Sequence, residues 1–185
     1  ADDHRLADRD AVPGAMSDEE AALIVTAGTA MYGLDALGGL VAGEGLVVTG
    51  PGPIGLMSVA VGKALGAQPV ILTGTRKSRL DLGIKLGADH AVNVRDENAV
   101  EAVKRITKGK GVHYVIECSG SPDAVRVLVE AGASLDIKDT AWGATPLGWA
   151  EYYVAEGPGP REGTQYEEIA TYLRGKDATH TGEAR

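Results

Sequence analysis

Residues 46–66 read LVVTGPGPIGLMSVAVGKALG and carry the clearest structural signals of the sequence. The apolar run 46–49 stops at Gly50, which indicates a short buried strand. After the turn, apolar residues recur at helical spacing, and Gly66 is typical of the residue that follows a helix. A strand, a glycine-rich turn and a helix in this order predict the first βα step of a parallel sheet.

The same alternation continues along the chain. Further strands are predicted at 70–73, 91–94 and 114–117, with helices over 78–86 and around Val100, Val103 and Ile106. Upstream, Ser17 and Glu20 form a capping-box pattern that starts a helix at Ser17, and a second helix is predicted over 29–40. We therefore predict an α/β fold over residues 1–122: a truncated Rossmann unit, a parallel sheet of about four strands with helices on both faces.

The glycine-rich turn predicts a dinucleotide site. Gly50 permits the tight turn, Gly52 lets the backbone approach a pyrophosphate, and Gly55 lets the helix pack against the strand. Pro53 suits the first helical turn, and Ile54 follows it. The helix start offers free N–H groups and a positive dipole end to the phosphates. A packing turn without a ligand is the alternative.

The end of the second strand distinguishes between cofactors. An NAD site usually has an acidic residue there, whereas this sequence has Gly74, Thr75, Arg76 and Lys77. A hydroxyl and two cations would pair with a 2′-phosphate, with Arg79 as a further candidate. The sequence thus favours NADP over NAD; a solvent-facing loop that is basic by chance is the alternative.

Composition excludes several classes of function. The formal net charge of −8 argues against a nucleic-acid partner. No apolar run approaches the roughly 20 residues that cross a bilayer, so we expect a soluble, cytoplasmic protein without a membrane partner. The single cysteine and the scattered histidines at 4, 90, 113 and 180 predict no zinc or other metal site.

Residues 2–124 resemble the cofactor domain of medium-chain, zinc-type alcohol dehydrogenases, on the stretches SDEEAALI, GLVVTGPGPIGLMSVAVGKALGA, KLGADHAVNV and VIECSGSP. The resemblance implies NAD or NADP binding and hydride transfer, with Cys118 and Ser119 beside the adenosine half. We interpret Cys118 itself as a small buried hydrophobic residue. The family's last zinc-ligand position falls near Val25 and Thr26, which cannot hold an activating metal. Its catalytic zinc domain is almost absent from this sequence, so cofactor binding is predicted more firmly than turnover.

Residues 123–178 resemble ankyrin repeats instead, on AVRVLVEAGASLDIKDT, WGATPLGWA and YEEIATYL. The resemblance implies a small all-α segment within a second unit, 123–185, with a last helix over 166–173 and a polar tail from 176. About three ankyrin repeats are needed to form a stable unit on their own, and fewer than two are present here. We therefore expect the apolar helix residues to pack on the open sheet edge or on a second copy of the chain: Val125, Leu128, Val129, Leu147, Trp149, Ile169 and Leu173.

Three functional interpretations stay open. The first is an NADP(H)-dependent oxidoreductase acting on carbonyl or alcohol substrates; Ser119, Tyr32 and Tyr114 could donate a proton, but no catalytic residue is assigned. The second is a non-catalytic nucleotide-binding or protein-interaction module whose ankyrin-like helices meet a protein partner. The third is a recombined or truncated gene product without the ancestral activities. In each case the incomplete sheet and repeats favour a homo-oligomer.

Overall fold

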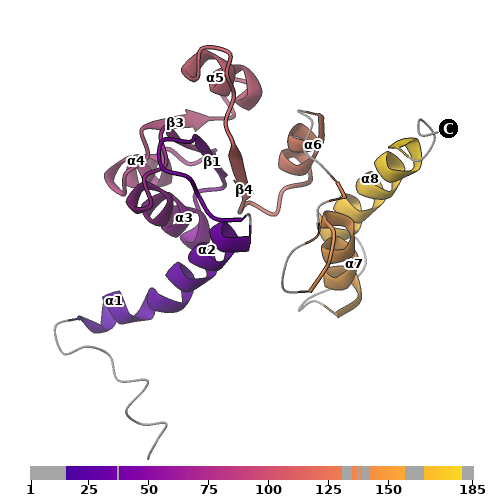
Figure 1. The fold of residues 1–185 in the computed structure, drawn as a ribbon, viewed down its shortest axis with the longest axis horizontal. Helices are drawn as coiled ribbons and strands as arrows, with labels where there is room; N and C mark the ends of the chain where they lie inside the picture. The colour runs from indigo at the N-terminus through magenta and orange to yellow at the C-terminus, as the bar shows by residue number, and fades with distance from the viewer. Residues whose placement is uncertain are drawn as a thin grey trace, which may run out of the picture.

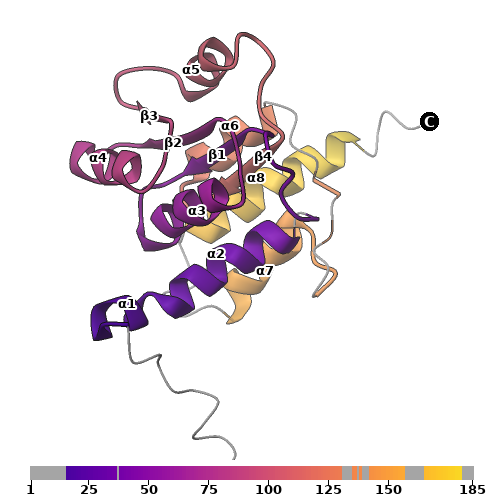
Figure 2. The same ribbon diagram turned by 60° about the vertical axis from the view of Figure 1, so that its left-hand side comes forward.

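The computed structural model describes residues 16–36, 38–130, 135–136, 138, 142–156 and 165–180, with only the backbone for 177–180. A parallel sheet with its helices forms one part of the molecule, and three later helices lie to one side of it (Figures 1 and 2). The irregular lead-in predicted before residue 16 lies outside the described residues, as do most of the connections between the later helices.

Four strands form the sheet: β1 (Leu46–Thr49), β2 (Val70–Gly74), β3 (His90–Asn93) and β4 (Tyr114–Glu117). Their order is β3-β2-β1-β4, and all pairs are parallel. The predicted strands are confirmed, with β3 beginning one residue earlier than expected. Because the chain crosses from one edge of the sheet to the other between β3 and β4, the carboxyl ends of β1 and β4 flank a topological switch point, where ligands bind in open α/β sheets.

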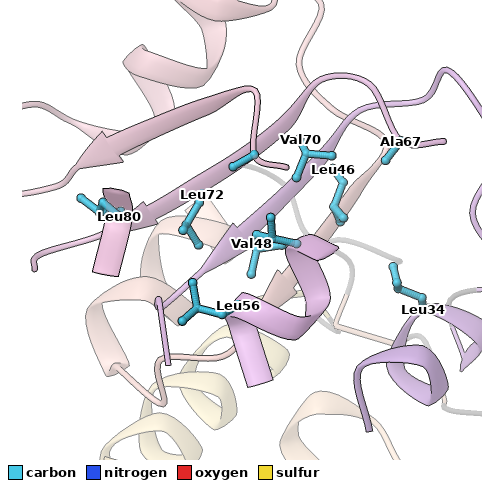
Figure 3. Close-up of a cluster of buried hydrophobic side chains, with 10 residues drawn as sticks. Leu34, Leu46, Val48, Leu56, Ala67, Val70, Leu72 and Leu80 are labelled. Carbon is cyan, nitrogen blue, oxygen red and sulfur yellow. The ribbon is translucent and has the colours of Figure 1, made fainter. Parts of the chain in front are cut away.

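Helices cover both faces of this sheet, as predicted. On one face, α3 (Pro53–Ala64) and α4 (Lys77–Lys85) pack over alternate strand residues (Figure 3), in a core that includes Leu46, Val48, Leu56, Val59, Val70, Leu72 and Leu80. On the other face, α5 (Ala99–Ile106) packs against Val47 and Ile71 through Ala102, Val103 and Ile106. Strand residues that are apolar on both sides are what a sheet buried on two faces requires.

The first two helices are α1 (Asp18–Ala22) and α2 (Ile24–Ala36). The capping box is confirmed, because the Ser17 hydroxyl accepts from Glu20 N at 3.2 Å and the Glu20 carboxylate accepts from Ser17 N at 2.8 Å. The predicted bounds of the second helix were wrong: α2 begins at Ile24 and ends before Gly38, whose φ of +92° is incompatible with continuing the helix.

The later helices are α6 (Pro122–Glu130), α7 (Pro146–Glu156) and α8 (Gln165–His180). The Thr145 hydroxyl accepts from Gly148 N at 3.1 Å and so caps the start of α7. The expected polar tail from residue 176 was wrong in part, because α8 continues to His180. No helix in the described ranges is both long and apolar enough to span a bilayer.

These helices pack on one another, and the expectation that they would cover the sheet edge was wrong. Ala150, Ile169, Ala170 and Leu173 form a separate buried cluster, joined by Val125, Val129, Leu135, Leu147 and Tyr172. Leu128 faces a cleft instead, and Trp149 belongs to a group of partly exposed aromatic rings. All four β4 residues stay partly exposed, so α6 does not fully cover this edge strand.

Candidate functional site

The glycine-rich turn lies where three strands end. Gly50 N donates to Thr73 O of β2 at 2.9 Å, and Cys118 N of the β4 exit donates to Thr49 O at 2.9 Å. Gly50 has a φ of +87°, and a methyl group there would lie 2.7 Å from the Cα and N of Ser119. No larger residue can occupy this position, because its backbone is left-handed and packed against the β4 exit.

The remaining glycines of the turn meet different neighbours. A methyl group at Gly55 would overlap the carbonyl oxygen of Gly50, and one at Gly74 would overlap the Pro51 ring. At Gly52, by contrast, a methyl group would meet nothing within 4 Å among the described residues. Gly52 is the N-cap of α3 and Pro53 its first residue, with no side chain capping the helix start. No side chain satisfies the N–H groups at the start of α3, and the space beside Gly52 is open, which are conditions for binding an anion.

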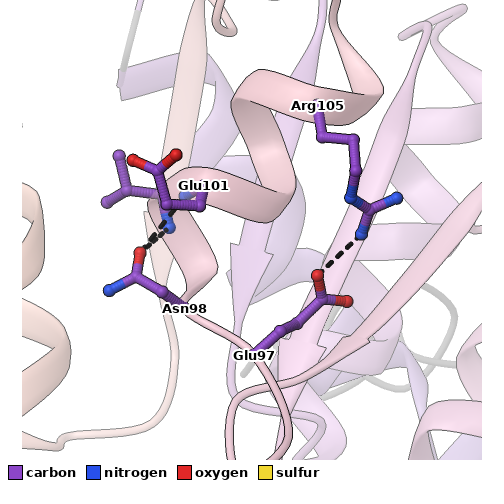
Figure 4. Close-up of polar contacts among 5 residues, drawn as sticks. Glu97, Asn98, Glu101 and Arg105 are labelled. Atoms are coloured by element: carbon purple, nitrogen blue, oxygen red, sulfur yellow. Dashed lines mark hydrogen bonds and ion pairs between the residues drawn. The ribbon is translucent and has the colours of Figure 1, made fainter.

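A cleft of about 790 Å³ opens beside this turn. Its floor includes Thr49, Gly50, Gly74 and Thr75; one wall is α5 and the other is α6. Figure 4 shows how the α5 wall is fixed at its start: Asn98 Oδ1 accepts from Val100 N at 2.9 Å and from Glu101 N at 3.1 Å, while Arg105 pairs with Glu97 at 2.7 Å. The walls are largely valine and leucine, with polar groups at the rim, as in cofactor clefts.

The basic segment after β2 begins at the edge of this cleft. Thr75 lines the cleft, and Thr75, Arg76 and Lys77 are all exposed. Lys77 Nζ pairs with Asp81 at 2.7 Å, one turn along α4. Among the residues that the structure describes, Arg76 and Arg79 form no ion pair. Arg76 directly follows Thr75, which lines the cleft, and no described carboxylate neutralises its charge. Among the predicted phosphate ligands, Arg76 is therefore the best placed cation.

Glu117 organises the β4 exit, and sequence reasoning missed it. Its Oε1 accepts from Thr49 Oγ1 at 3.0 Å and from Ser119 N at 2.7 Å, and the Ser119 hydroxyl also donates to it. Its Oε2 accepts from Gly120 N at 3.0 Å. One carboxylate therefore joins the ends of β1 and β4 and holds the turn that packs on Gly50. The only sequence signal was an acidic residue ending an apolar strand.

Cys118 is a packing residue in this arrangement. Burial raises the pKa of its thiol to about 11, although a hydrogen bond with Ser58 of α3 opposes the shift. A thiol with this pKa is neutral at physiological pH and is a poor nucleophile. Its position, between the sheet and α3, agrees with its interpretation as a small hydrophobic residue.

The three candidate proton donors are not brought together. Ser119 lies at the carboxyl edge of the sheet with the glycine turn. Tyr114 is at the opposite edge, in register with Leu46, and a hydrogen bond to Glu44 raises the pKa of its phenol. Tyr32 lies on α2 and is 52% exposed. The structure therefore assigns no catalytic group among them.

No group of three or more His, Cys, Asp or Glu side chains in the described ranges is arranged to hold a metal ion. Val25, near the family's last zinc-ligand position, is 79% exposed. The prediction that no zinc is bound stays a prediction.

Residues 53–134 match the family model of zinc-binding dehydrogenases. This segment is similar to the zinc-binding dehydrogenase domain. It begins at the first residue of α3, directly after the open glycine position, and includes the α5 and α6 walls of the cleft.

Curated relatives extend the similarity to the N-terminal side. L-threonine 3-dehydrogenase of Thermococcus kodakarensis is 42% identical over 119 residues, which are 64% of this chain and 33% of that protein. Sorbitol dehydrogenase of Bacillus subtilis is 38% identical over 115 residues, 62% of this chain and 32% of its own. The matched regions span only 27% to 41% of the curated relatives.

Solved structures share the fold. An alcohol dehydrogenase from Thermotoga maritima superposes with a TM-score of 0.57 at 31% identity, over 65% of this chain and 33% of that one. A structure described as a zinc-binding dehydrogenase from Sinorhizobium meliloti 1021 bound to NADP gives a TM-score of 0.56 at 30% identity, over 62% and 34% of the two chains.

Proposed function

We propose that this chain binds the dinucleotide NADP(H), with the pyrophosphate over Gly52 and the start of α3. The open space at Gly52 carries the proposal, because the flanking glycines are required by close packing and Gly52 is not. The adenosine half would enter the cleft between α5 and α6, near Thr75 and Ser119, which line it, whereas Cys118 packs against the core on the α3 face. The similarity to a structure bound to NADP supports the same cofactor class.

The choice of NADP rests on the connection between β2 and α4. Gly74 ends the strand without a carboxylate, so nothing there would repel a 2′-phosphate. Thr75 and the guanidinium of Arg76 would bind this phosphate, with Lys77 and Arg79 adding positive charge. Lys77 contributes less than Arg76, because Asp81 already neutralises it.

Titration of the fluorescence of NADPH and NADH with the Arg76→Ala variant tests this assignment. The variant loses a charge-assisted hydrogen bond worth about 1.5–3 kcal/mol. Its affinity for NADPH is therefore expected to fall by about tenfold or more, while its affinity for NADH stays nearly unchanged. Lys85→Ala is the control: it removes one positive charge at the far end of α4, whose N-cap is Arg76. It is expected to change the affinity for neither NADPH nor NADH. Equal losses for the two nucleotides in Arg76→Ala would remove the 2′-phosphate assignment.

We further infer an oxidoreductase role toward carbonyl or alcohol substrates. The nicotinamide of a bound NADP(H) would supply or accept the hydride; the residues of this chain would bind and orient the cofactor through the turn and the cleft. The relatives named L-threonine 3-dehydrogenase and sorbitol dehydrogenase support this class of reaction. NADPH consumption with a panel of aldehydes and ketones tests it, and nucleotide binding without consumption would leave a binding module.

That binding module is the second candidate, and the exposed aromatic group on α7 and α8 favours it. Trp149 contacts Tyr152 and Tyr153, and Tyr153 stacks on Tyr166 with ring centroids 4.9 Å apart. Partly exposed tyrosine and tryptophan are typical of protein interfaces. In this interpretation the ankyrin-like helices of unit 123–185 meet a protein partner or a second copy of the chain. The homo-oligomer and the cytoplasmic location stay predictions.

A further inference from the structure

Helix α6 takes part in two different environments. Ala124, Val127 and Leu128 line the cleft, whereas Val125 and Val129 pack into the cluster formed by α7 and α8. The opposite wall, α5, is anchored on the sheet through Ala102, Val103 and Ile106. No described α6 residue belongs to either sheet core. The cleft is therefore bounded by one wall fixed to the sheet and one wall fixed to the C-terminal helices.

Arg126 makes the polar contacts that hold the second wall. Its Nη2 donates to Glu168 Oε1 of α8 at 2.6 Å, and its guanidinium lies 5.5 Å from the centroid of the Tyr172 ring. Its Nη1 donates to Asp123 Oδ1 at 3.2 Å. Asp123 lines the cleft, so one side chain connects a cleft residue with two residues of α8.

We propose that Arg126 is a positioning residue that fixes α6 against α8, so that the affinity of the cleft for nucleotide depends on the C-terminal helices. The inference rests on the proposed nucleotide function. A ligand that needs both walls binds with an apparent affinity reduced by the fraction of molecules in which α6 is in place. By reciprocity, bound nucleotide stabilises the contact between α6 and α8. The C-terminal helices thereby regulate the cleft from outside it.

Two variants at this contact test the proposal against a matched control. Arg126→Ala and Glu168→Gln each break the pair between α6 and α8 and are expected to raise the Kd for NADPH about two- to fivefold, the effect of losing an exposed ion pair with its packing. Arg174→Ala is the control, because it breaks the 2.9 Å pair between Arg174 of α8 and Glu151 of α7 and leaves the α6 contacts in place. Its Kd for NADPH should stay within about twofold of the wild-type value. In 0.5 M salt the ratio of variant to wild-type Kd should approach one, because screening weakens the pair in the wild type.

Amide hydrogen exchange supplies a readout that a general loss of stability would not move. NADPH is expected to slow exchange in residues 165–176 of the unmodified chain and to have little effect there in Arg126→Ala. Wild-type affinity in a folded Glu168→Gln variant, together with unchanged exchange in 165–176 on adding NADPH to the wild type, would overturn the coupling. Failure of the unmodified chain to bind NADPH would refute the proposed function instead, so the two failures are distinguishable.

Discussion

At the scale of single residues, the glycines of the turn are needed for different reasons. Their spacing predicted a role for each, and the structure confirms the packing part: Gly50 and Gly55 are closed in by backbone atoms. It also separates them from Gly52, which has room for a side chain and whose φ of −82° suits any residue. Stability and ligand binding can therefore be tested at different positions of one motif.

Gly55→Ala is expected to destabilise the protein by about 1–3 kcal/mol, because its methyl group overlaps the carbonyl of Gly50 and the sheet and α3 must separate. Gly52→Ala should cost at most about 1 kcal/mol, the difference between glycine and alanine as an N-cap. It should nevertheless weaken NADPH binding at least tenfold, since the methyl group occupies the proposed pyrophosphate position. Urea unfolding and nucleotide titration measure the two effects. Unchanged NADPH affinity in Gly52→Ala would place the pyrophosphate elsewhere.

Cys118 gives a prediction about pH. Its folded-state pKa of about 11 lies above the ordinary value of 9.0, so folding favours the neutral thiol. Its contribution to stability is fully present below pH 9 and is lost as the pH rises toward 11, by about 1.4 kcal/mol per unit. In urea unfolding, the unmodified chain should therefore lose more stability between pH 9 and 10.5 than Cys118→Ala does. Parallel losses in the two proteins would mean that the thiol is not buried.

At the scale of elements, the sequence was sufficient where local signals agree. Short apolar runs predicted the four strands, and those of β1 and β2 stop at a glycine and are buried on both faces. Helix ends were less predictable: nothing local distinguishes the end of α8 at His180 from a polar tail. The role of Glu117 was also inaccessible, because the hydrogen bond that ties it to β1 comes from Thr49, 68 residues away in the sequence. Contacts of that kind exist only after the sheet forms.

The start of α5 offers a test of what fixes one wall of the cleft. Asn98→Ala removes an N-cap that accepts from two backbone N–H groups and is expected to cost about 1 kcal/mol of stability. The neighbouring Glu97→Gln breaks an exposed ion pair with Arg105 and should cost less, about 0.5 kcal/mol or under. Thermal unfolding of the two variants compares the effects. A larger loss in Glu97→Gln would show that the ion pair, rather than the cap, holds the helix start.

At the scale of the whole molecule, the chain has two kinds of core. The sheet cores are built from segments adjacent in a βα alternation, which the sequence shows directly. The C-terminal cluster joins α6, α7 and α8 across long connections. The sequence offers fewer than two ankyrin-like repeats, which is too few to fold independently. We therefore expected these helices to pack on the sheet edge or on a second copy of the chain. They pack on each other instead, because α6 gives them a third helix and buries Leu173 to 2% exposure.

Because α6 packs into the C-terminal cluster and into neither sheet core, the two parts of the molecule are predicted to respond separately to core substitutions. Both tryptophans, Trp142 and Trp149, lie outside the sheet, so their fluorescence reports on the C-terminal helices. Leu173→Ala should cost about 2–5 kcal/mol in that cluster and lower the urea midpoint of fluorescence more than that of far-UV circular dichroism. Val48 is fully buried in the sheet core, so Val48→Ala should lower mainly the urea midpoint measured by circular dichroism. If each variant shifts both transitions equally, the chain unfolds as one cooperative unit, and α6 transmits the whole stability of one core to the other.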